Sequence, residues 1–237
     1  MRILPILLLL AVLATAKANT IVQLDTAYGS MKFELYDTDK PITVTNFLKY
    51  ITSGRYENSF AHRLEPGFVL QGGGFTLEGN TIDYVPSYGT ILNEYSAGTT
   101  YSNIYGTIAM ARSSGVNSAT SQWFINLKDN SFLDSVNEGF TVFGHIIEGM
   151  DVLEDFLDFI YLPQNTTNAT DVVVNASSIG SVFNQLPVQK VTNNTYGPTD
   201  LVYTEWSIIP VPEPSTYALL VIGSAFGIIA FRRLRAA

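Results

Sequence analysis

The sequence contains no cysteine, and this absence limits the chemistry open to it. Without a thiol, the chain can form no disulfide, supply no thiolate nucleophile and build no cysteine-rich zinc site. Histidine is almost as scarce, since His62 and His145 are the only two and stand far apart. Two isolated imidazoles without cysteine partners argue against a metal cluster, so neither a metal nor another cofactor is expected.

Basic side chains are also few in the body of the chain. Residues 19–210 hold eight Lys and Arg against twenty Asp and Glu. Nucleic-acid binding depends on clustered basic side chains that neutralise phosphates, so DNA and RNA are not expected partners. Neither a Gly-x-Ser-x-Gly elbow nor a Gly-x-x-x-x-Gly-Lys-Ser/Thr loop occurs, so hydrolase and nucleotide functions lack support.

The N-terminus has the parts of a secretory signal peptide. Arg2 is followed by the apolar run 3–13, and Ala16 and Ala18 supply small residues where a signal peptidase reads. The apolar run is shorter than the roughly 20 residues that a membrane span needs, which counts against an uncleaved anchor. We expect signal peptidase to remove residues 1–18.

The C-terminal residues 211–237 combine a proline-rich spacer, an apolar run and terminal arginines. Pro212-Glu213-Pro214 precedes the apolar run 216–231, which is about long enough to span a thin bilayer, and three arginines follow. The arginines would stay on the cytoplasmic side and the body outside. This order resembles the PEP-CTERM sorting signal of Gram-negative bacteria. The resemblance implies an exosortase-type processing enzyme and a periplasmic or cell-surface location; an ordinary C-terminal anchor is the alternative.

Hydrophobic periodicity between the two ends predicts many strands and two helices. Alternation over 21–36 predicts a β-hairpin. Apolar residues spaced at i, i+3, i+4 and i+7 over 44–51 predict a helix that ends at Gly54. The pattern then predicts short strands over 59–149, a second helix over 152–160 and a closing strand over 201–209. Few helices and many strands favour a closed or nearly closed β-barrel with attached helices.

Residues 163–199 are rich in Asn, Thr and Ser and contain three prolines, so they are predicted to form a long insertion loop with one embedded strand. They carry four Asn-x-Ser/Thr sequons, which matter only in a glycosylating secretory pathway. The sequon residues are Asn165, Asn168, Asn175 and Asn193.

Several short motifs occur in a fixed order along the middle of the chain. Residues 60–75 read FAHRLEPGFVLQGGGF. They are followed by GTIAMAR at 106–112, NSATSQWFIN at 117–126, FLD at 132–134, VFG at 142–144 and EGMD at 148–151. This series closely resembles the cyclophilins, a family of peptidyl-prolyl cis/trans isomerases, from about residue 20 to residue 160 and in the closing strand. The resemblance implies a mainly β fold: a closed eight-stranded antiparallel barrel capped by two helices.

The resemblance also implies a substrate groove and a catalytic pair. Arg63 and Gln71 are expected to be catalytic, and proline-containing polypeptides are the expected partners. The implied substrate-binding residues are Phe68, Val69, Ala111, Arg112, Gln122, Phe124, Phe132, Leu133 and Phe140. Strand parity supports part of this set, because Val69 and Gln71 share a face, as do Gln122 and Phe124.

Four positions depart from the family pattern. Ala61 stands where many members have Phe, and Val69 replaces a common Met. Phe132 replaces a Trp that helps many eukaryotic members to bind cyclosporin, so weak binding of that drug is expected. Phe140 replaces a His or Tyr and costs a polar contact. None of these changes removes Arg63.

Three functions are compatible with these features. The first is an exported foldase that isomerises prolyl bonds in extracytoplasmic proteins. The second is a non-enzymatic prolyl-peptide-binding module or surface matrix protein that uses the same fold only for binding. The third is a eukaryotic secretory-pathway isomerase with a glycosylated insertion and a plain anchor.

Overall fold

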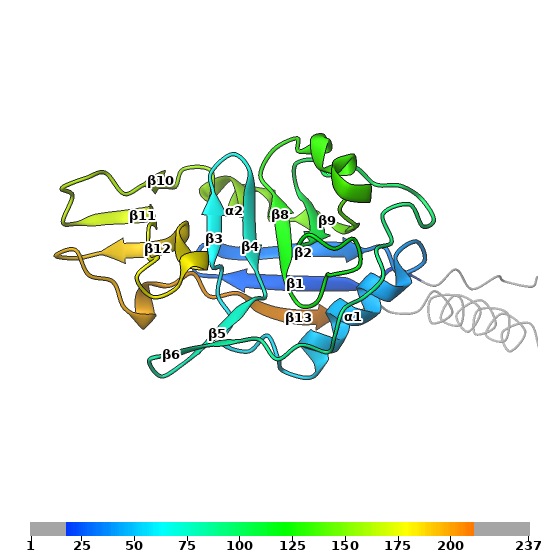
Figure 1. The fold of residues 1–237 in the computed structure, drawn as a ribbon, viewed down its shortest axis with the longest axis horizontal. Coiled ribbons are helices and arrows are strands. Elements are labelled where there is room, and N and C mark those ends of the chain that lie inside the picture. The colour runs from blue at the N-terminus through cyan, green and yellow to red at the C-terminus, as the bar shows by residue number, and fades with distance from the viewer. Residues whose placement is uncertain (1–17, 211–237) are drawn as a thin grey trace, which may run out of the picture. The chain divides into compact units, whose positions relative to one another are not determined.

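The computed structural model of the protein describes residues 18–210, which contain two α-helices and thirteen β-strands (Figure 1). The helices are α1 (Pro41–Thr52) and α2 (Met150–Asp155). The strands are β1 (Ile21–Thr26), β2 (Gly29–Leu35), β3 (Arg63–Glu65), β4 (Val69–Gly72), β5 (Phe75–Glu78), β6 (Thr81–Tyr84), β7 (Thr107–Met110), β8 (Trp123–Asn126), β9 (Val142–Glu148), β10 (Ile160–Tyr161), β11 (Ala169–Val174), β12 (Leu186–Val191) and β13 (Glu205–Ile209). Four short 3-10 helices are η1 (Ser131–Asp134), η2 (Val136–Glu138), η3 (Ser181–Phe183) and η4 (Pro198–Asp200).

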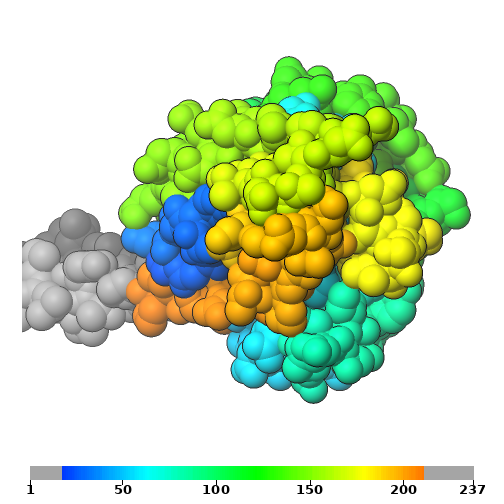
Figure 2. Space-filling view, turned by 90° about the vertical axis from the view of Figure 1, so that its left-hand side faces the viewer, coloured from blue at the N-terminus to red at the C-terminus, as the bar shows by residue number. Residues whose placement is uncertain are grey.

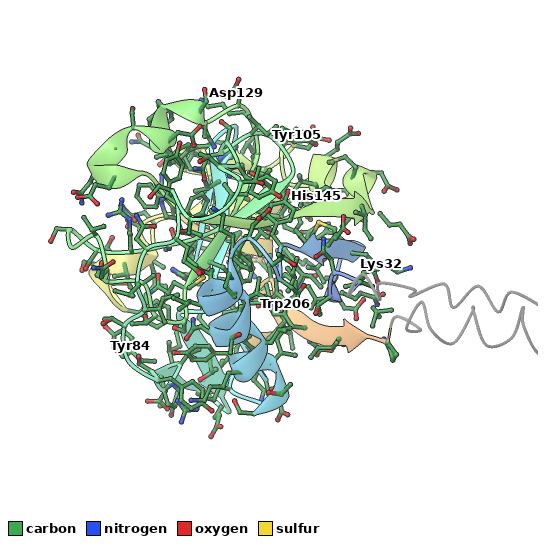
Figure 3. All side chains as sticks on the ribbon, turned by 90° about the vertical axis from the view of Figure 1, so that its right-hand side faces the viewer. Lys32, Tyr84, Tyr105, Asp129, His145 and Trp206 are labelled. Atoms are coloured by element: carbon green, nitrogen blue, oxygen red, sulfur yellow. The ribbon has the colours of Figure 1, made fainter. Side chains whose placement is uncertain are left out.

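The predicted N-terminal hairpin and first helix are confirmed. β1 and β2 pair antiparallel, and their alternating residues Val22, Leu24, Met31 and Phe33 are fully buried. Helix α1 buries Val44 and Phe47 from its predicted apolar stripe. Trp206 of β13 packs edge-on against Phe47 with ring centroids 4.9 Å apart, beside α1 in Figure 3. The hairpin, α1 and β13 thus share one core.

Eight strands form one antiparallel sheet in the order β13-β1-β2-β9-β7-β8-β4-β3. The sheet curls, so that β3, β4 and β8 cross in front of β1 and β2 (Figure 1). The prediction of a closed barrel is wrong, because no ladder joins the two end strands, β13 and β3. A single isolated bridge, Phe60 with Tyr203, connects the segments that precede them. β3 has only three residues, and its outer edge is instead met by Gln185, whose carbonyl oxygen accepts from Leu64 N at 2.8 Å.

The second helix is shorter than the predicted span 152–160, since α2 ends at Asp155. It begins directly after β9, where Gly149 has φ +85°. Leu153 and Phe156 are fully buried against the main core, and the acidic residues Glu154 and Asp155 are exposed, as an amphipathic helix requires.

Residues 163–199 are not a long loop with one strand, and that prediction is wrong. They contain β11 and β12, which pair antiparallel, while β10 pairs parallel with β11. Val172, Phe183, Leu186 and Val188 bury their side chains in a second core that also receives Phe60. Figure 2, which faces this side of the molecule, shows the insertion in yellow-green to orange, packed into a continuous surface.

No helix within residues 18–210 combines the length and the apolar character needed to cross a membrane. The predicted signal peptide, at 1–18, lies outside the described residues except for its last position. The sorting signal 211–237, with its predicted membrane segment 216–231, lies wholly outside them.

Candidate active site

A row of side chains crosses four neighbouring strands on one face of the sheet. The strand register pairs Arg63 with Gln71, Gln71 with Phe124, and Phe124 with Ala109. Because side chains alternate along a strand, the next residue on each strand points to the other face. There the four apolar neighbours are fully buried in the main core: Leu64, Leu70, Ile125 and Ile108.

This row borders a cavity of about 190 Å³. Nine of the eleven residues predicted for the site line the cavity: Arg63, Phe68, Val69, Gln71, Ala111, Arg112, Phe124, Leu133 and Phe140. The other two, Gln122 and Phe132, contact lining residues. In residues 18–210 no group of three or more His, Asp or Glu side chains is placed to hold a metal ion.

A tight turn between β3 and β4 places Phe68 at the cavity. Phe68 N donates to the carbonyl oxygen of Glu65 at 2.8 Å, and Gly67 has φ +70°. Pro at the second position and a positive φ at the third are the marks of a type II turn. Phe68 stacks on Phe132 with ring centroids 5.9 Å apart. Phe68 therefore reaches the site from a turn, which strand parity could not have predicted.

Two hydrogen bonds hold the guanidinium of Arg63. Its Nε donates to Gln185 Oε1 at 2.7 Å, and its Nη2 donates to Glu65 Oε2 at 2.6 Å. Its Cζ lies 5.5 Å from the centroid of the Phe68 ring, and its side chain is 30% exposed. Nη1 forms no hydrogen bond with any described residue. The cavity is thus bordered by a fixed cation with unused donors.

Gln71, Gln122 and His62 add no charge near Arg63 at neutral pH. Gln71 Nε2 donates to Gln122 Oε1 at 2.8 Å. His62 is almost completely buried, and this burial lowers the pKa of its imidazole to about 4, with a further contribution from the Arg63 charge. His62 is therefore neutral at neutral pH, so the positive charge beside the cavity comes from the two lining arginines, Arg63 and Arg112.

Arg112 supports one wall of the cavity. Its Cζ lies 4.3 Å from the centroid of the Phe140 ring, and Phe140 meets Phe124 edge-on at 5.9 Å. Burial lowers the pKa of Arg112. Its Nη2 donates to the carbonyl oxygens of Val136, Asn137 and Gly139. These acceptors lie in the loop that carries Phe140. Arg112 therefore stabilises that loop and the position of the Phe140 ring.

A network of buried asparagines bonds the backbone of the lining residues Phe68 and Phe140, and it was not predicted from the sequence. Asn126 Nδ2 donates to Thr107 Oγ1 at 2.9 Å, and Asn130 Nδ2 donates to Asn126 Oδ1 at 2.8 Å. Asn103 Nδ2 donates to the carboxylate of Asp134 at 2.8 Å. The three asparagines are fully buried. Asn126 lies in the motif 117–126 and could have been suspected, but no periodicity singles out Asn103.

Comparison with known proteins gives the same family over most of the chain. Residues 21–179 match the family described as cyclophilin type peptidyl-prolyl cis-trans isomerase/CLD, and residues 210–235 match the PEP-CTERM protein-sorting motif. A peptidyl-prolyl cis-trans isomerase of Acinetobacter baylyi is 43% identical over 147 residues, which cover 61% of this chain and 76% of that protein. Peptidyl-prolyl cis-trans isomerase A of Dickeya dadantii is 41% identical over 141 residues, covering 59% and 72%.

A solved structure of the same family has the same fold as this chain. The crystal structure of a cyclophilin-type isomerase of Cryptosporidium parvum superposes with a TM-score of 0.53 at 23% identity, covering 82% of this chain and 99% of that one. The curled eight-stranded sheet, the ordered motifs and the matched relatives agree. The chain belongs to the cyclophilin family of peptidyl-prolyl cis-trans isomerases and carries a PEP-CTERM sorting motif at its C-terminus.

Proposed function

We propose that this isomerase is exported and acts on prolyl bonds of extracytoplasmic proteins, with Arg63 as the hydrogen-bond donor to the prolyl nitrogen. A prolyl bond isomerises slowly because twisting it breaks amide resonance, at a barrier of about 18–20 kcal/mol. No covalent bond has to form or break. A protein therefore accelerates the reaction by binding the twisted state more tightly than the planar one.

The position of Arg63 carries this proposal. In the twisted state the prolyl nitrogen regains a lone pair, which a well-placed donor can bind selectively. Arg63 stands at the edge of the cavity beside Gln71, and its Nη1 is not used by any described residue. A hydrogen bond from a charged donor contributes about 1.5–3 kcal/mol, which corresponds to a rate increase of roughly ten- to a hundredfold.

The remaining lining residues supply the surroundings that this donor needs. Phe124, Leu133 and Val69 are buried apolar side chains that would take up the proline ring. An apolar site that excludes water strengthens the electrostatic bond from Arg63. Gln71 has no hydrogen bond to Arg63 within the described part of the chain, so we assign its free amide oxygen to the substrate backbone.

The cis-to-trans rate of a short X-Pro peptide tests this function, with the full-length chain in mild detergent. We expect acceleration by the wild-type protein and a loss of at least tenfold in Arg63→Ala. Arg55→Ala is the matched control, because Arg55 stacks on Tyr88 and does not line the cavity. An unchanged rate in Arg63→Ala would refute the mechanism. Peptide binding by a folded chain without acceleration would instead favour the non-enzymatic binding module.

The PEP-CTERM motif supports export as the second half of the proposal. We infer that signal peptidase removes residues 1–18, that the apolar run 216–231 holds the chain in a membrane, and that an exosortase-type enzyme cuts near Pro212-Glu213-Pro214. The mass of the protein recovered from an exosortase-containing bacterium tests this. We expect both ends to be shortened, and the C-terminal cut to be lost when Pro212 and Pro214 are replaced by Ala. Recovery of the intact chain from the cytoplasm would contradict export.

A further inference from the structure

We propose that Gln185 is a positioning residue for the isomerase reaction, through which the insertion 163–199 fixes the guanidinium of Arg63. The inference rests on the proposed role of Arg63 as the donor. It gives a function to a segment that the catalytic motifs do not include.

Gln185 is tied to its surroundings at three points. Its carbonyl oxygen accepts from Leu64 N at 2.8 Å, which docks the chain on the outer edge of β3. Its side-chain Oε1 accepts from Arg63 Nε at 2.7 Å. Its Nε2 donates to the hydroxyl oxygen of Tyr161 in β10 at 3.0 Å. The Gln185 amide is therefore fixed by Tyr161 through its nitrogen, while its oxygen binds Arg63.

The backbone on both sides of Gln185 is anchored in the second core. Phe183 is 3% exposed and Leu186 is fully buried. The ring of Phe183 stacks near Phe60, with centroids 6.2 Å apart, and packs against Phe75 at 4.8 Å. Phe60 and Phe75 belong to the segments that flank β3 and β4. The insertion is thus packed directly on the part of the chain that carries Arg63.

The two bonds on Arg63 have different consequences. The pair with Glu65 joins two partly exposed side chains, 30% and 38% exposed, and ion pairs of this kind are weak. Gln185 binds Nε, at the base of the planar guanidinium, so it sets the direction in which the whole group lies. As a neutral acceptor, it does this without cancelling the positive charge.

Holding the donor before the substrate arrives benefits the chemical step. An arginine side chain has several rotatable bonds, and ordering them during the reaction costs conformational entropy. A guanidinium already fixed at Nε and Nη2 keeps Nη1 available in one orientation. Such preorganisation acts on the twisted state more than on substrate binding, so its loss should lower kcat more than it raises KM.

The test compares Gln185→Ala with Gln189→Ala in the full-length protein. Gln189 lies in the same insertion and donates to the carbonyl oxygen of Leu201 at 2.8 Å, without touching Arg63. We expect Gln185→Ala to lower kcat about tenfold, with KM changed by less than about twofold. We also expect it to shift or broaden the Arg63 Nε–H signal in the NMR spectrum. Gln189→Ala should change neither quantity.

Three other results would refute the positioning role of Gln185, and they can be told apart. An active wild-type protein with an unchanged kcat in Gln185→Ala would refute the positioning role alone. An equal fall in Gln189→Ala would show a general effect of the insertion and would also refute it. A folded wild-type protein without isomerase activity would refute the proposed function and this inference together. If Gln185→Ala does not fold, Gln185→Met keeps the side-chain length, lacks the amide and is judged by the same results.

Discussion

Asn130 holds the carbonyl oxygen of Phe68 through its side-chain Nδ2 group, at a distance of 2.8 Å. The same group donates to Asn126 Oδ1 at 2.8 Å, and Asn130 itself is fully buried. Phe68 follows the turn after β3, whereas Leu133 lies in the η1 helix that starts just after Asn130. One amide therefore fixes the spacing between two segments that line the cavity.

Replacement of Asn130 by Ala should lower the free energy of unfolding by about 1–3 kcal/mol, because the carbonyl oxygen of Phe68 and the amide of Asn126 each lose a buried partner. It should also weaken peptide binding, since the segments of Phe68 and Leu133 lose their link. Urea unfolding and peptide titration measure the two effects. Asn184→Ala, which removes an exposed amide in the insertion, should change neither.

The hydrogen bonds among the buried residues Asn103, Asn126 and Asn130 could not be predicted from the sequence. Alternation within a strand is a local property, so the sequence could place Val69 with Gln71 and Gln122 with Phe124. The register that aligns Arg63, Gln71 and Phe124 across three strands comes from the structure. The partners of the buried asparagines come from the separate segments around Asn103 and Asp134. No local pattern encodes such long-range pairs, so most residues that line the cavity could be predicted but the hydrogen bonds that support them could not.

The insertion was mispredicted for a related reason. Val172 and Val174 are buried in the second core, whereas Val173 is buried in the main core. A strand that is buried on both faces shows an unbroken apolar run without alternation, and short runs of this kind are ambiguous. The surrounding Asn and Thr residues then favoured a loop. The sequence also could not show that β3 and β13 stay unpaired, because strand pairing at a sheet edge depends on contacts distant in sequence.

Lys40 provides a test of stability away from the cavity. Its side chain is fully buried, burial lowers its pKa, and its Nζ donates to the carbonyl oxygens of Glu94, Tyr95 and Ala97 at 2.5–3.1 Å. Lys40→Met should lower the free energy of unfolding by about 3 kcal/mol, because it leaves three carbonyl oxygens without their shared donor. The exposed Lys128→Met is the control in urea unfolding and should stay within about 0.5 kcal/mol of the wild type. A similar small change in Lys40→Met would contradict this view.

The stability of the protein should rise with pH between about 4 and 6.5 because of His62. Its pKa in the folded state is lowered to about 4, mainly by burial, whereas an unfolded histidine titrates near 6.5. In this window the unfolded chain binds more protons than the folded chain, so stability is lost as the pH falls. The size of this contribution is about 3 kcal/mol for a shift of this magnitude.

Urea unfolding at pH 7 and pH 5 measures the effect, with two histidine variants for comparison. His62→Gln removes the titrating group and should reduce the difference in unfolding free energy between the two pH values. His145→Gln, at a partly exposed site, should leave most of that difference in place. An equal pH dependence in the wild type and His62→Gln would show that other groups are responsible.

Phe132 should determine the sensitivity of the enzyme to cyclosporin. Phe132 is 54% exposed, and its ring stacks on Phe68 beside the cavity. The resemblance to the cyclophilins implies a Trp at this position in many eukaryotic members that bind the drug. Phe offers no hydrogen-bond donor, whereas the indole N–H of Trp does, and one such bond contributes about 1 kcal/mol. Weak inhibition of the wild type and roughly five- to tenfold stronger inhibition of Phe132→Trp are therefore expected in the peptide isomerisation assay. Ile147→Trp adds an indole at an exposed position that does not line the cavity, and it should leave the inhibition unchanged. Equal inhibition of Phe132→Trp and the wild type would mean that position 132 does not contact the drug in this protein.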